Sequence, residues 1–293
     1  RILPSKYIMT KEKDNNLIKN YQKSQLKNKN VAKSAKNSFK DKLLSIIQRS
    51  IYPDNYSCLV CNKEIQAGSK YCLCEDCLKV FPFNNGRICV KCGAPIENEA
   101  CYCLECQNYE KGFDFARSSL RYEGDAKRLV LSLKFYNNRW LAKYFADMLY
   151  DTYMQNRMDA DVIIAVPISH KRQKVRGYNQ SLLIAKPLAE RLNLPLLTNV
   201  IEKVKENKQQ ASLSLRERRE NVIDVYRVTD RNAVKGKKVL VVDDILTTGS
   251  TLGEISRRLK IVGATNVYGL VVASPKYVVP SEYTQDNLDF EIL

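Results

Sequence analysis

The stretch that decides the fold is Val239-Leu-Val-Val-Asp243-Asp244-Ile-Leu-Thr247-Thr248-Gly249-Ser250-Thr251. Its four consecutive apolar residues are typical of a strand that is buried on both faces of a sheet. Two carboxylates follow at the carboxyl end of that strand, and a small, hydroxyl-rich turn then leads into a helical pattern over residues 252–262. Because ligands of open α/β sheets bind outside the carboxyl ends of the strands, the stretch predicts a binding site at this point.

The residue types in this stretch suit a phosphorylated sugar. The turn can offer successive backbone N–H groups, hydroxyls and a helix N-terminus to a phosphate. Asp243 and Asp244 have the wrong charge for a phosphate but can accept hydrogen bonds from sugar hydroxyls, so a ribose 5-phosphate would satisfy both halves. The stretch is not a P-loop, because it lacks Gly-x-x-x-x-Gly-Lys-Ser/Thr. The alternative is a plain strand end followed by a plain helix cap. The candidate phosphate-binding residues are Thr247, Thr248, Gly249, Ser250 and Thr251.

The sequence around this stretch alternates between strand-like and helix-like segments. Apolar runs at residues 162–166, 239–242 and 267–272 are interleaved with amphipathic helical patterns at residues 180–192 and 252–262. This alternation predicts an α/β fold with a mostly parallel sheet flanked by helices.

A basic segment follows the strand that ends at Val166. We expect residues 167–180 to form a loop before a helix, and several cations on a flexible backbone there would suit a pyrophosphate. The alternatives are a solvated basic loop and a nucleic-acid contact. His170, the only histidine, has no Ser, Cys or Asp partner at a recognisable spacing, which favours a structural role. The candidate residues of the loop are Lys171, Arg172, Lys174, Arg176 and Gly177.

All ten cysteines lie between Cys58 and Cys106, mostly in repeated Cys-x-x-Cys pairs. Two thiolates at this spacing can face one ion across a tight turn, and two pairs complete a tetrahedral site. The two predicted sets are Cys58, Cys61, Cys74 and Cys77, and Cys89, Cys92, Cys103 and Cys106. Four thiolates leave no open position, which predicts one or two structural zinc ions, with an iron–sulfur cluster as the rival. The surplus Cys72 and Cys101 either replace a ligand or are bystanders. The clustering indicates a reducing cytoplasm.

The ends of the chain differ from its middle in charge and composition. Lys and Arg number 48 against 32 Asp and Glu, and residues 1–57 alone hold 13 basic and 4 acidic side chains. This excess favours polyanionic partners. We expect a disordered basic tail at 1–37, an amphipathic helix at 38–57 and a polar tail at 281–293. The helix either packs on the cysteine module or docks a partner or membrane. No apolar run is long enough to span a membrane.

Three further stretches of the chain contain distinctive residue strings. Tyr122-Glu-Gly precedes a helical segment with Lys134, a Val-Pro-Ile-Ser-His-Lys-Arg string begins at Val166, and Gln210 precedes Leu-Ser-Leu-Arg-Glu-Arg-Arg. Residues 239–251 resemble the motif with which type I phosphoribosyltransferases bind 5-phosphoribosyl 1-pyrophosphate (PRPP). From about residue 46 to 273 the sequence resembles the ComF (ComFC) competence-protein family. That family joins a double zinc ribbon, here residues 58–110, to a phosphoribosyltransferase-like domain, here residues 111–280. The long basic tail departs from the family's compact form.

The resemblance implies a magnesium-dependent phosphoribosyltransferase. Asp243 and Asp244 would be the catalytic pair that holds the ribose hydroxyls and, through them or through water, Mg²⁺. Residues 171–177 would be the pyrophosphate loop, and the basic run at 202–220 would lie near the hood over the sugar, unless it is a solvated helix. The acceptor is unidentified, since no residue set indicates a nucleobase site. The alternative is a non-catalytic protein that senses PRPP or binds single-stranded DNA. The family is associated with DNA uptake, which implies single-stranded DNA and competence or DNA-processing proteins as partners.

Overall fold

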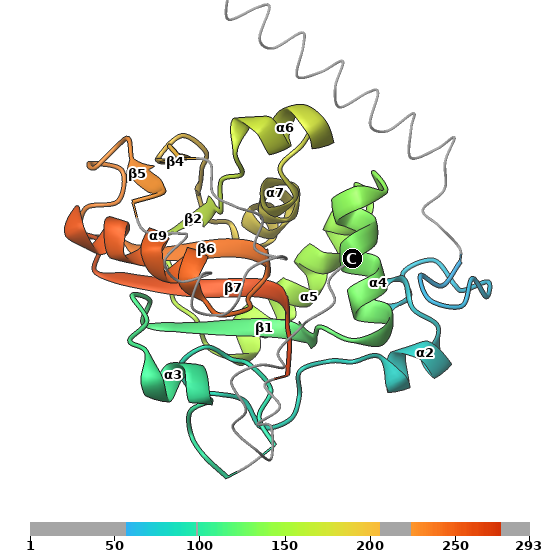
Figure 1. Cartoon of the computed structure of the whole chain (residues 1–293). Coiled ribbons are helices and arrows are strands. Elements are labelled where there is room, and N and C mark those ends of the chain that lie inside the picture. Colours follow the sequence, from blue (N-terminus) through green and yellow to red (C-terminus); the bar gives the residue numbers. More distant parts are fainter. Residues whose placement is uncertain (1–56, 98, 206–223, 277–293) are drawn as a thin grey trace, which may run out of the picture.

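The computed structural model describes residues 57–97, 99–205 and 224–276 (Figure 1). Its main sheet has five strands in the order β1-β7-β6-β2-β3, and every neighbouring pair in it is parallel. A separate antiparallel ribbon is formed by β4 and β5. The strands are β1 (Phe115–Arg121), β2 (Val162–Ala165), β3 (Leu196–Leu197), β4 (Ile201–Lys203), β5 (Tyr226–Val228), β6 (Lys238–Ile245) and β7 (Asn266–Ser274).

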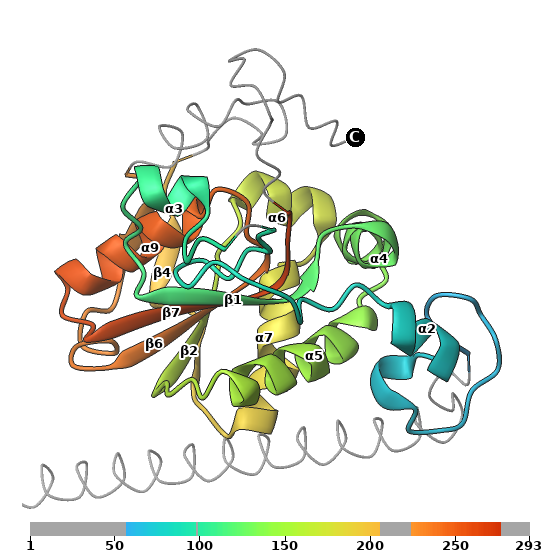
Figure 2. The same cartoon turned by 90° about the horizontal axis from the view of Figure 1, so that it is seen from below.

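Helices cover both faces of the main sheet, with α5 and α7 on one face and α9 on the other (Figure 2). Side chains alternate along the central strand β6, so Leu240 and Val242 pack with α5 and α7, whereas Val239 and Val241 pack with α9. This burial on both faces explains the unbroken apolar run. The helices of this domain are α4 (Gly124–Phe135), α5 (Leu141–Gln155), α6 (His170–Arg176), α7 (Gln180–Leu192) and α9 (Ser250–Ile261). The predicted fold class is confirmed.

The basic segment after β2 differs from the expectation of a loop, because residues 170–176 form helix α6. The Ser169 side chain accepts a hydrogen bond from the Arg172 backbone N–H, which caps the first turn. Gly177 ends the helix in the left-handed conformation, at φ 75°. The predicted loop is wrong. These residues have no apolar periodicity that would indicate a helix, and the helix is instead bounded by its caps at Ser169 and Gly177.

The order of the strands creates a switch point between β2 and β6. After β2 the chain continues through α7 to β3 on one side, whereas after β6 it continues through α9 to β7 on the other side. Because α7 and α9 cover opposite faces, the connections that leave these two strands diverge at their carboxyl ends. Ligands of doubly wound sheets bind at such a switch point, and the predicted site lies there.

Two cysteine knuckles precede β1 and pack on different parts of the sheet domain (Figure 2). Their helical segments are η1 (Lys70–Cys72), α2 (Glu75–Val80) and α3 (Leu104–Asn108). The first knuckle packs against α4 and α5, and the second packs against β1 and α9. The expectations for the tail at 1–37, the helix at 38–57 (apart from residue 57), residues 281–293 and the hood residues 206–220 lie outside the described part of the chain. Among the described helices, none combines the length and apolar character that crossing a bilayer requires.

Candidate functional site

The carboxylates Asp243 and Asp244 lie near the carboxyl end of strand β6, before the turn that opens α9. Asp244 is only 4% exposed, and its Oδ1 is 3.0 Å from the Lys134 ammonium of α4. Its Oδ2 is buried and has no hydrogen-bond partner among the described residues. The Oδ1 of Asp243 accepts hydrogen bonds of 2.8 Å from the Ser181 hydroxyl and from the Asp244 backbone N–H. Oδ1 of Asp243 therefore has two donors inside the protein, whereas the buried Oδ2 of Asp244 has none among the described residues.

The environment of Asp243 makes its negative charge costly. Burial raises the pKa of this carboxyl to about 7, and the neighbouring negative charge of Asp244 adds to the rise. The Ser181 hydroxyl, the Asp244 backbone N–H and Lys134 act in the opposite direction. Asp243 thus gains or loses its proton near neutral pH.

The turn from residue 247 to 251 opens helix α9 next to these carboxylates. Gly249 caps the helix with φ 74°, and a Cβ atom there would lie 3.3 Å from the Phe113 ring, so the position favours glycine. The Thr248 and Ser250 hydroxyl oxygens are 2.7 Å apart and hydrogen-bonded to each other. Thr251 on the first turn of α9 is hydrogen-bonded to the hydroxyl of the buried Tyr226. All five predicted phosphate-binding residues thus surround one helix N-terminus, where an anion is favoured.

The five residues predicted for the pyrophosphate loop lie on α6 and its cap, at the carboxyl end of β2. Lys171 and Lys174 are exposed, whereas Arg176 is half-buried, and burial lowers its pKa although Asp244 attracts its charge. The Arg176 guanidinium lies 4.8 Å from the centre of the Phe135 ring and donates to Gln180 at 3.1 Å. Since β2 and β6 are neighbours in the sheet, the structure brings α6, the carboxylates and the turn to the same edge.

Three side chains have contacts at the site that the sequence does not indicate. Lys134 stands out in the sequence only as part of a longer string, yet it forms the ion pair with Asp244. Ser181 and Lys111 were not singled out, although Ser181 donates to Asp243 and Lys111 donates to the Thr248 backbone carbonyl. Each of these contacts joins residues more than 60 positions apart, so no local spacing indicates it.

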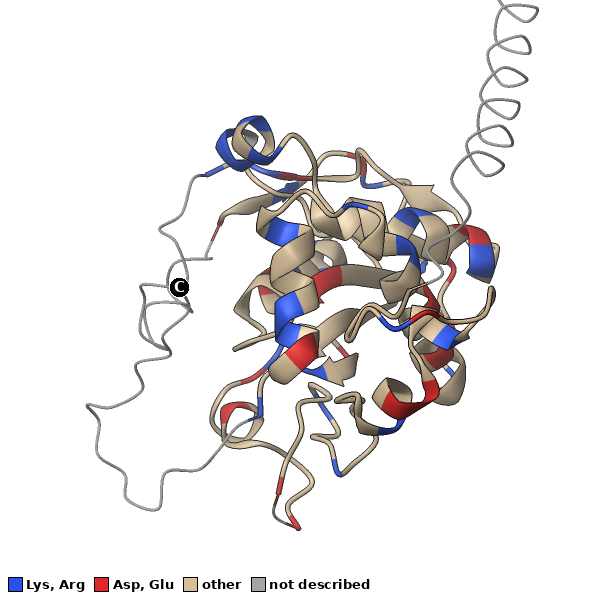
Figure 3. Cartoon of the chain, turned by 90° about the vertical axis from the view of Figure 1, so that its right-hand side faces the viewer, with Lys and Arg blue, Asp and Glu red and all other residues tan. Residues whose placement is uncertain are grey.

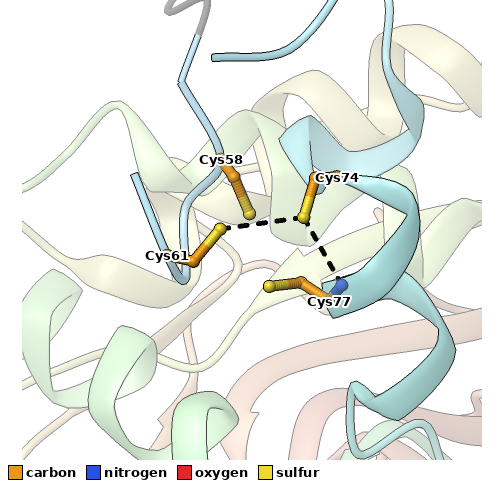
Figure 4. A group of neighbouring side chains, drawn as sticks. All are labelled: Cys58, Cys61, Cys74 and Cys77. Atoms are coloured by element: carbon orange, nitrogen blue, oxygen red, sulfur yellow. Dashed lines mark hydrogen bonds between the residues drawn. The ribbon is translucent and has the colours of Figure 1, made fainter. Parts of the chain in front are cut away.

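The eight predicted metal ligands form two groups of four thiols, and in each group all sulfur atoms lie within 4.8 Å of one another. Figure 4 shows the first group, with the sulfurs pointing toward a common centre. The Cys61–Cys74 and Cys92–Cys103 sulfur separations are 3.7 and 3.6 Å. Four thiolates at zinc bond lengths of about 2.3 Å in a tetrahedron would be roughly 3.8 Å apart. The two groups therefore fit a double zinc ribbon.

The surplus cysteines lie outside both groups of ligands. The Cys72 thiol is buried and donates to the Ser57 backbone carbonyl at 3.4 Å, while Cys101 is exposed. This arrangement favours the bystander interpretation over exchange with a ligand.

The chain is similar to one protein family and to several known proteins. The phosphoribosyl transferase domain family matches residues 178–287. The chain is 32% identical to competence protein F of Haemophilus influenzae over 230 residues, which cover 75% of this chain and 98% of that protein. It is 29% identical to the DNA utilization protein YhgH of Salmonella typhimurium, over 72% of this chain and 93% of that protein. Among solved structures, it resembles a purine phosphoribosyltransferase from Pyrococcus horikoshii at 21% identity and a TM-score of 0.30, over 48% of this chain and 80% of that one.

Proposed function

This chain belongs to the competence protein F family, and we propose that it binds PRPP together with Mg²⁺ at the carboxyl ends of β6 and β2. The observation that carries the proposal is the buried Oδ2 of Asp244 before the N-terminus of α9, which has no hydrogen-bond partner among the described residues. A buried acceptor without a partner costs free energy, and a donor from a ligand would remove that cost. In this proposal residues 58–110 form the double zinc ribbon and residues 111–280 the PRPP-binding domain.

Each part of PRPP has a counterpart in this arrangement. The 5-phosphate suits the turn at 247–251, where backbone N–H groups and hydroxyls meet a helix N-terminus. The ribose hydroxyls suit Asp243 and Asp244, which are acceptors when ionised. The pyrophosphate suits the cations of α6, at the end of the adjacent strand.

The carboxylate pair also fits Mg²⁺, which prefers oxygen ligands and keeps several of its waters. Asp243 and Asp244 would hold the ion directly or through water. When bound, Mg²⁺ would neutralise part of the negative charge on the pyrophosphate. The Lys134 ammonium lies 3.0 Å from Asp244 and balances its buried charge. The carboxylate therefore has a counter-charge within the chain before any ligand binds.

We propose phosphoribosyl transfer as the reaction, with an acceptor that is not identified. An acceptor nucleophile would form a bond to C1 of the ribose while the bond from C1 to the pyrophosphate oxygen breaks and pyrophosphate leaves. The chain's own contribution is to position the sugar between the turn and the carboxylates and to stabilise the leaving group with the cations of α6.

A second candidate function is binding of single-stranded DNA on the same edge of the protein. Phe135, Tyr136 and Trp140, near the connection from α4 to α5, are 59%, 74% and 45% exposed. Figure 3 shows the predominantly basic helix α6 on the same side of the molecule as α4. Aromatic faces beside cations suit stacked bases and their phosphates. The names of the relatives, competence protein F and DNA utilization protein, are consistent with such a partner.

Calorimetric titration of the zinc-loaded protein with PRPP, with and without Mg²⁺, tests the first proposal. We expect binding that depends on Mg²⁺ and is abolished in the variant Asp243→Asn/Asp244→Asn. The variant should keep its zinc content and its circular dichroism spectrum, because the cysteine groups lie elsewhere. Unchanged PRPP affinity in the variant, or no binding to the unmodified chain, would contradict the proposal and leave single-stranded DNA as the ligand to test.

A further inference from the structure

We propose that the second cysteine group holds the phosphate-binding turn in shape through Lys111, whereas the first group does not. The identity of the ligand at the turn rests on the proposed function, but the contacts that carry this inference do not. Lys111 follows the last cysteine ligand by five residues and lies between the second knuckle and the sheet domain. In this role Lys111 is a positioning residue, because it contacts the backbone of the turn and no ligand.

The contacts of Lys111 join three separate parts of the chain. Its ammonium is 3.2 Å from the Glu105 carboxylate and donates at 2.8 Å to the Thr248 backbone carbonyl. The side chains of Lys111 and Glu105 are 6% and 8% exposed, so the ion pair is buried. A buried ion pair resists separation, because the loss of one partner would leave the other charge buried and unpaired.

The position of Glu105 is fixed by the metal-binding knuckle. Glu105 lies on α3 between the ligands Cys103 and Cys106. The backbone N–H of Cys106 and that of Gln107 both donate to the Cys103 carbonyl, which closes this short turn. A metal ion bound by the four thiolates would therefore fix the carboxylate that orients Lys111.

The chain that directly follows Lys111 also fits tightly against α9 and the turn before it. A Cβ atom on Gly112 would lie 2.4 Å from the Gly253 carbonyl oxygen, so only glycine allows this approach. Phe113, the next residue, is fully buried against Gly249 of the turn. The knuckle, Lys111 and the first turn of α9 consequently form one packed unit.

The hydrogen bond to the Thr248 carbonyl sets the direction of a whole peptide group. In a planar trans peptide, the carbonyl of Thr248 and the N–H of Gly249 point in opposite directions. By drawing the carbonyl toward the knuckle, Lys111 turns the Gly249 N–H to the opposite side, where it can face an anion. Loss of Lys111 would free this peptide to rotate and would weaken the anion site without removing any group from it.

The first cysteine group has no such connection to the turn in the part of the chain that the structure describes. Its contacts run to the helices, through Lys70 to Asp151 of α5 at 3.0 Å and through Arg128 of α4 to the Val60 carbonyl at 3.2 Å. Among the described contacts, only those of the second group reach the turn, so the two metal sites are inequivalent and the second can affect phosphate binding directly.

Hydrogen exchange measured by mass spectrometry on the full, zinc-loaded chain tests the inference. Lys111→Met should speed exchange at residues 246–253 by about tenfold, as expected for the loss of a charge-assisted hydrogen bond. Glu105→Gln/Lys111→Met removes both buried charges, retains all eight thiols and should show the same acceleration. Lys70→Met, which breaks the more exposed ion pair that joins the first knuckle to α5, should leave the turn unchanged. Unchanged exchange at the turn in the double variant would overturn the inference.

The metal part of the inference has its own comparison. Cys103→Ser should release one zinc ion and accelerate exchange at the turn, whereas Cys74→Ser should release one zinc ion and leave the turn protected. Equal effects of the two variants would overturn the inequivalence of the sites.

Binding measurements separate this inference from the proposed function. Ribose 5-phosphate should bind the double variant about tenfold more weakly than it binds the unmodified chain, whereas Mg²⁺-pyrophosphate should bind both equally, because α6 is not touched. If the unmodified chain binds neither compound while exchange at the turn responds as described, the proposed function fails and the positioning role of Lys111 stands. If ribose 5-phosphate binds both proteins equally, the positioning role is wrong.

Discussion

At the scale of single residues, the candidate site contains two neighbouring carboxylates with different surroundings. Asp243 has its hydrogen-bond donors inside the protein, from Ser181 and the backbone, whereas the buried Oδ2 of Asp244 has none among the described residues. The motif at residues 239–251 indicated the pair and its position after a strand. It could not indicate how the two acids differ, because that difference comes from Lys134 and Ser181 on helices that are distant in sequence.

The raised pKa of Asp243 predicts a pH dependence of stability. A carboxyl with a pKa near 4 in the unfolded chain and about 7 in the folded one binds its proton more tightly in the folded state. Its contribution to stability is therefore complete below about pH 4 and is lost as the pH rises through 7. Asp243→Asn removes this titration, so its stability relative to the unmodified chain should increase by on the order of 1–2 kcal/mol between pH 5 and 8. Urea unfolding at these pH values checks this, and a difference that does not change with pH would contradict it.

At the scale of elements, long periodic segments were predicted well and short polar ones were not. The predicted helix at 180–192 coincides with α7, and the predicted strand at 239–242 lies inside β6. Burial on both faces of the sheet requires these apolar patterns, so the sequence alone is enough to predict the elements that carry them. Helix α6 has no such pattern, because its stability depends on the Ser169 cap and the left-handed Gly177 rather than on an apolar face.

The helical form of α6 leads to a prediction for three of its cations, the exposed Lys171 and Lys174 and the partly buried Arg172. A helix holds the side chains Lys171, Arg172 and Lys174 on one fixed backbone. We therefore expect all three to contribute to binding the same anion. Changing all three to Gln should weaken binding of Mg²⁺-pyrophosphate at least tenfold and leave the thermal midpoint within about 2 °C, because surface substitutions have small effects on stability.

The matched control for α6 removes three exposed cations before the opposite end of β6. Arg231, Lys235 and Lys237 precede the start of that strand, away from the carboxylates. Changing these to Gln should leave pyrophosphate binding unchanged. Equal losses in the two triple variants would mean that net charge, rather than the place of α6, controls the affinity.

At the scale of the whole molecule, the sequence indicated the parts of the chain but not the contacts between them. The two sets of cysteine ligands were evident from their spacing. That one knuckle packs on α4 and α5 while the other reaches the turn of α9 could not be predicted, because the contact from Lys111 to Thr248 joins residues 137 positions apart. Such contacts are set by tertiary packing, which leaves no periodic trace in the sequence.

The distribution of charge over the whole chain carries the last prediction. Residues 1–37 contain ten Lys or Arg and two Asp or Glu, a large part of the excess of 48 basic over 32 acidic residues. If this segment contacts the phosphates of single-stranded DNA, each contact releases counterions and steepens the dependence of affinity on salt by about 0.7 in a log–log plot. Deleting residues 1–37 should therefore weaken binding of an oligothymidine at low salt and flatten the slope by about 2–4, with zinc content and PRPP binding unchanged. Fluorescence anisotropy between 50 and about 300 mM salt measures both quantities. An unchanged slope would show that the segment does not contact DNA phosphates, and would leave α6 and the exposed aromatic residues beside it as the remaining candidate surface.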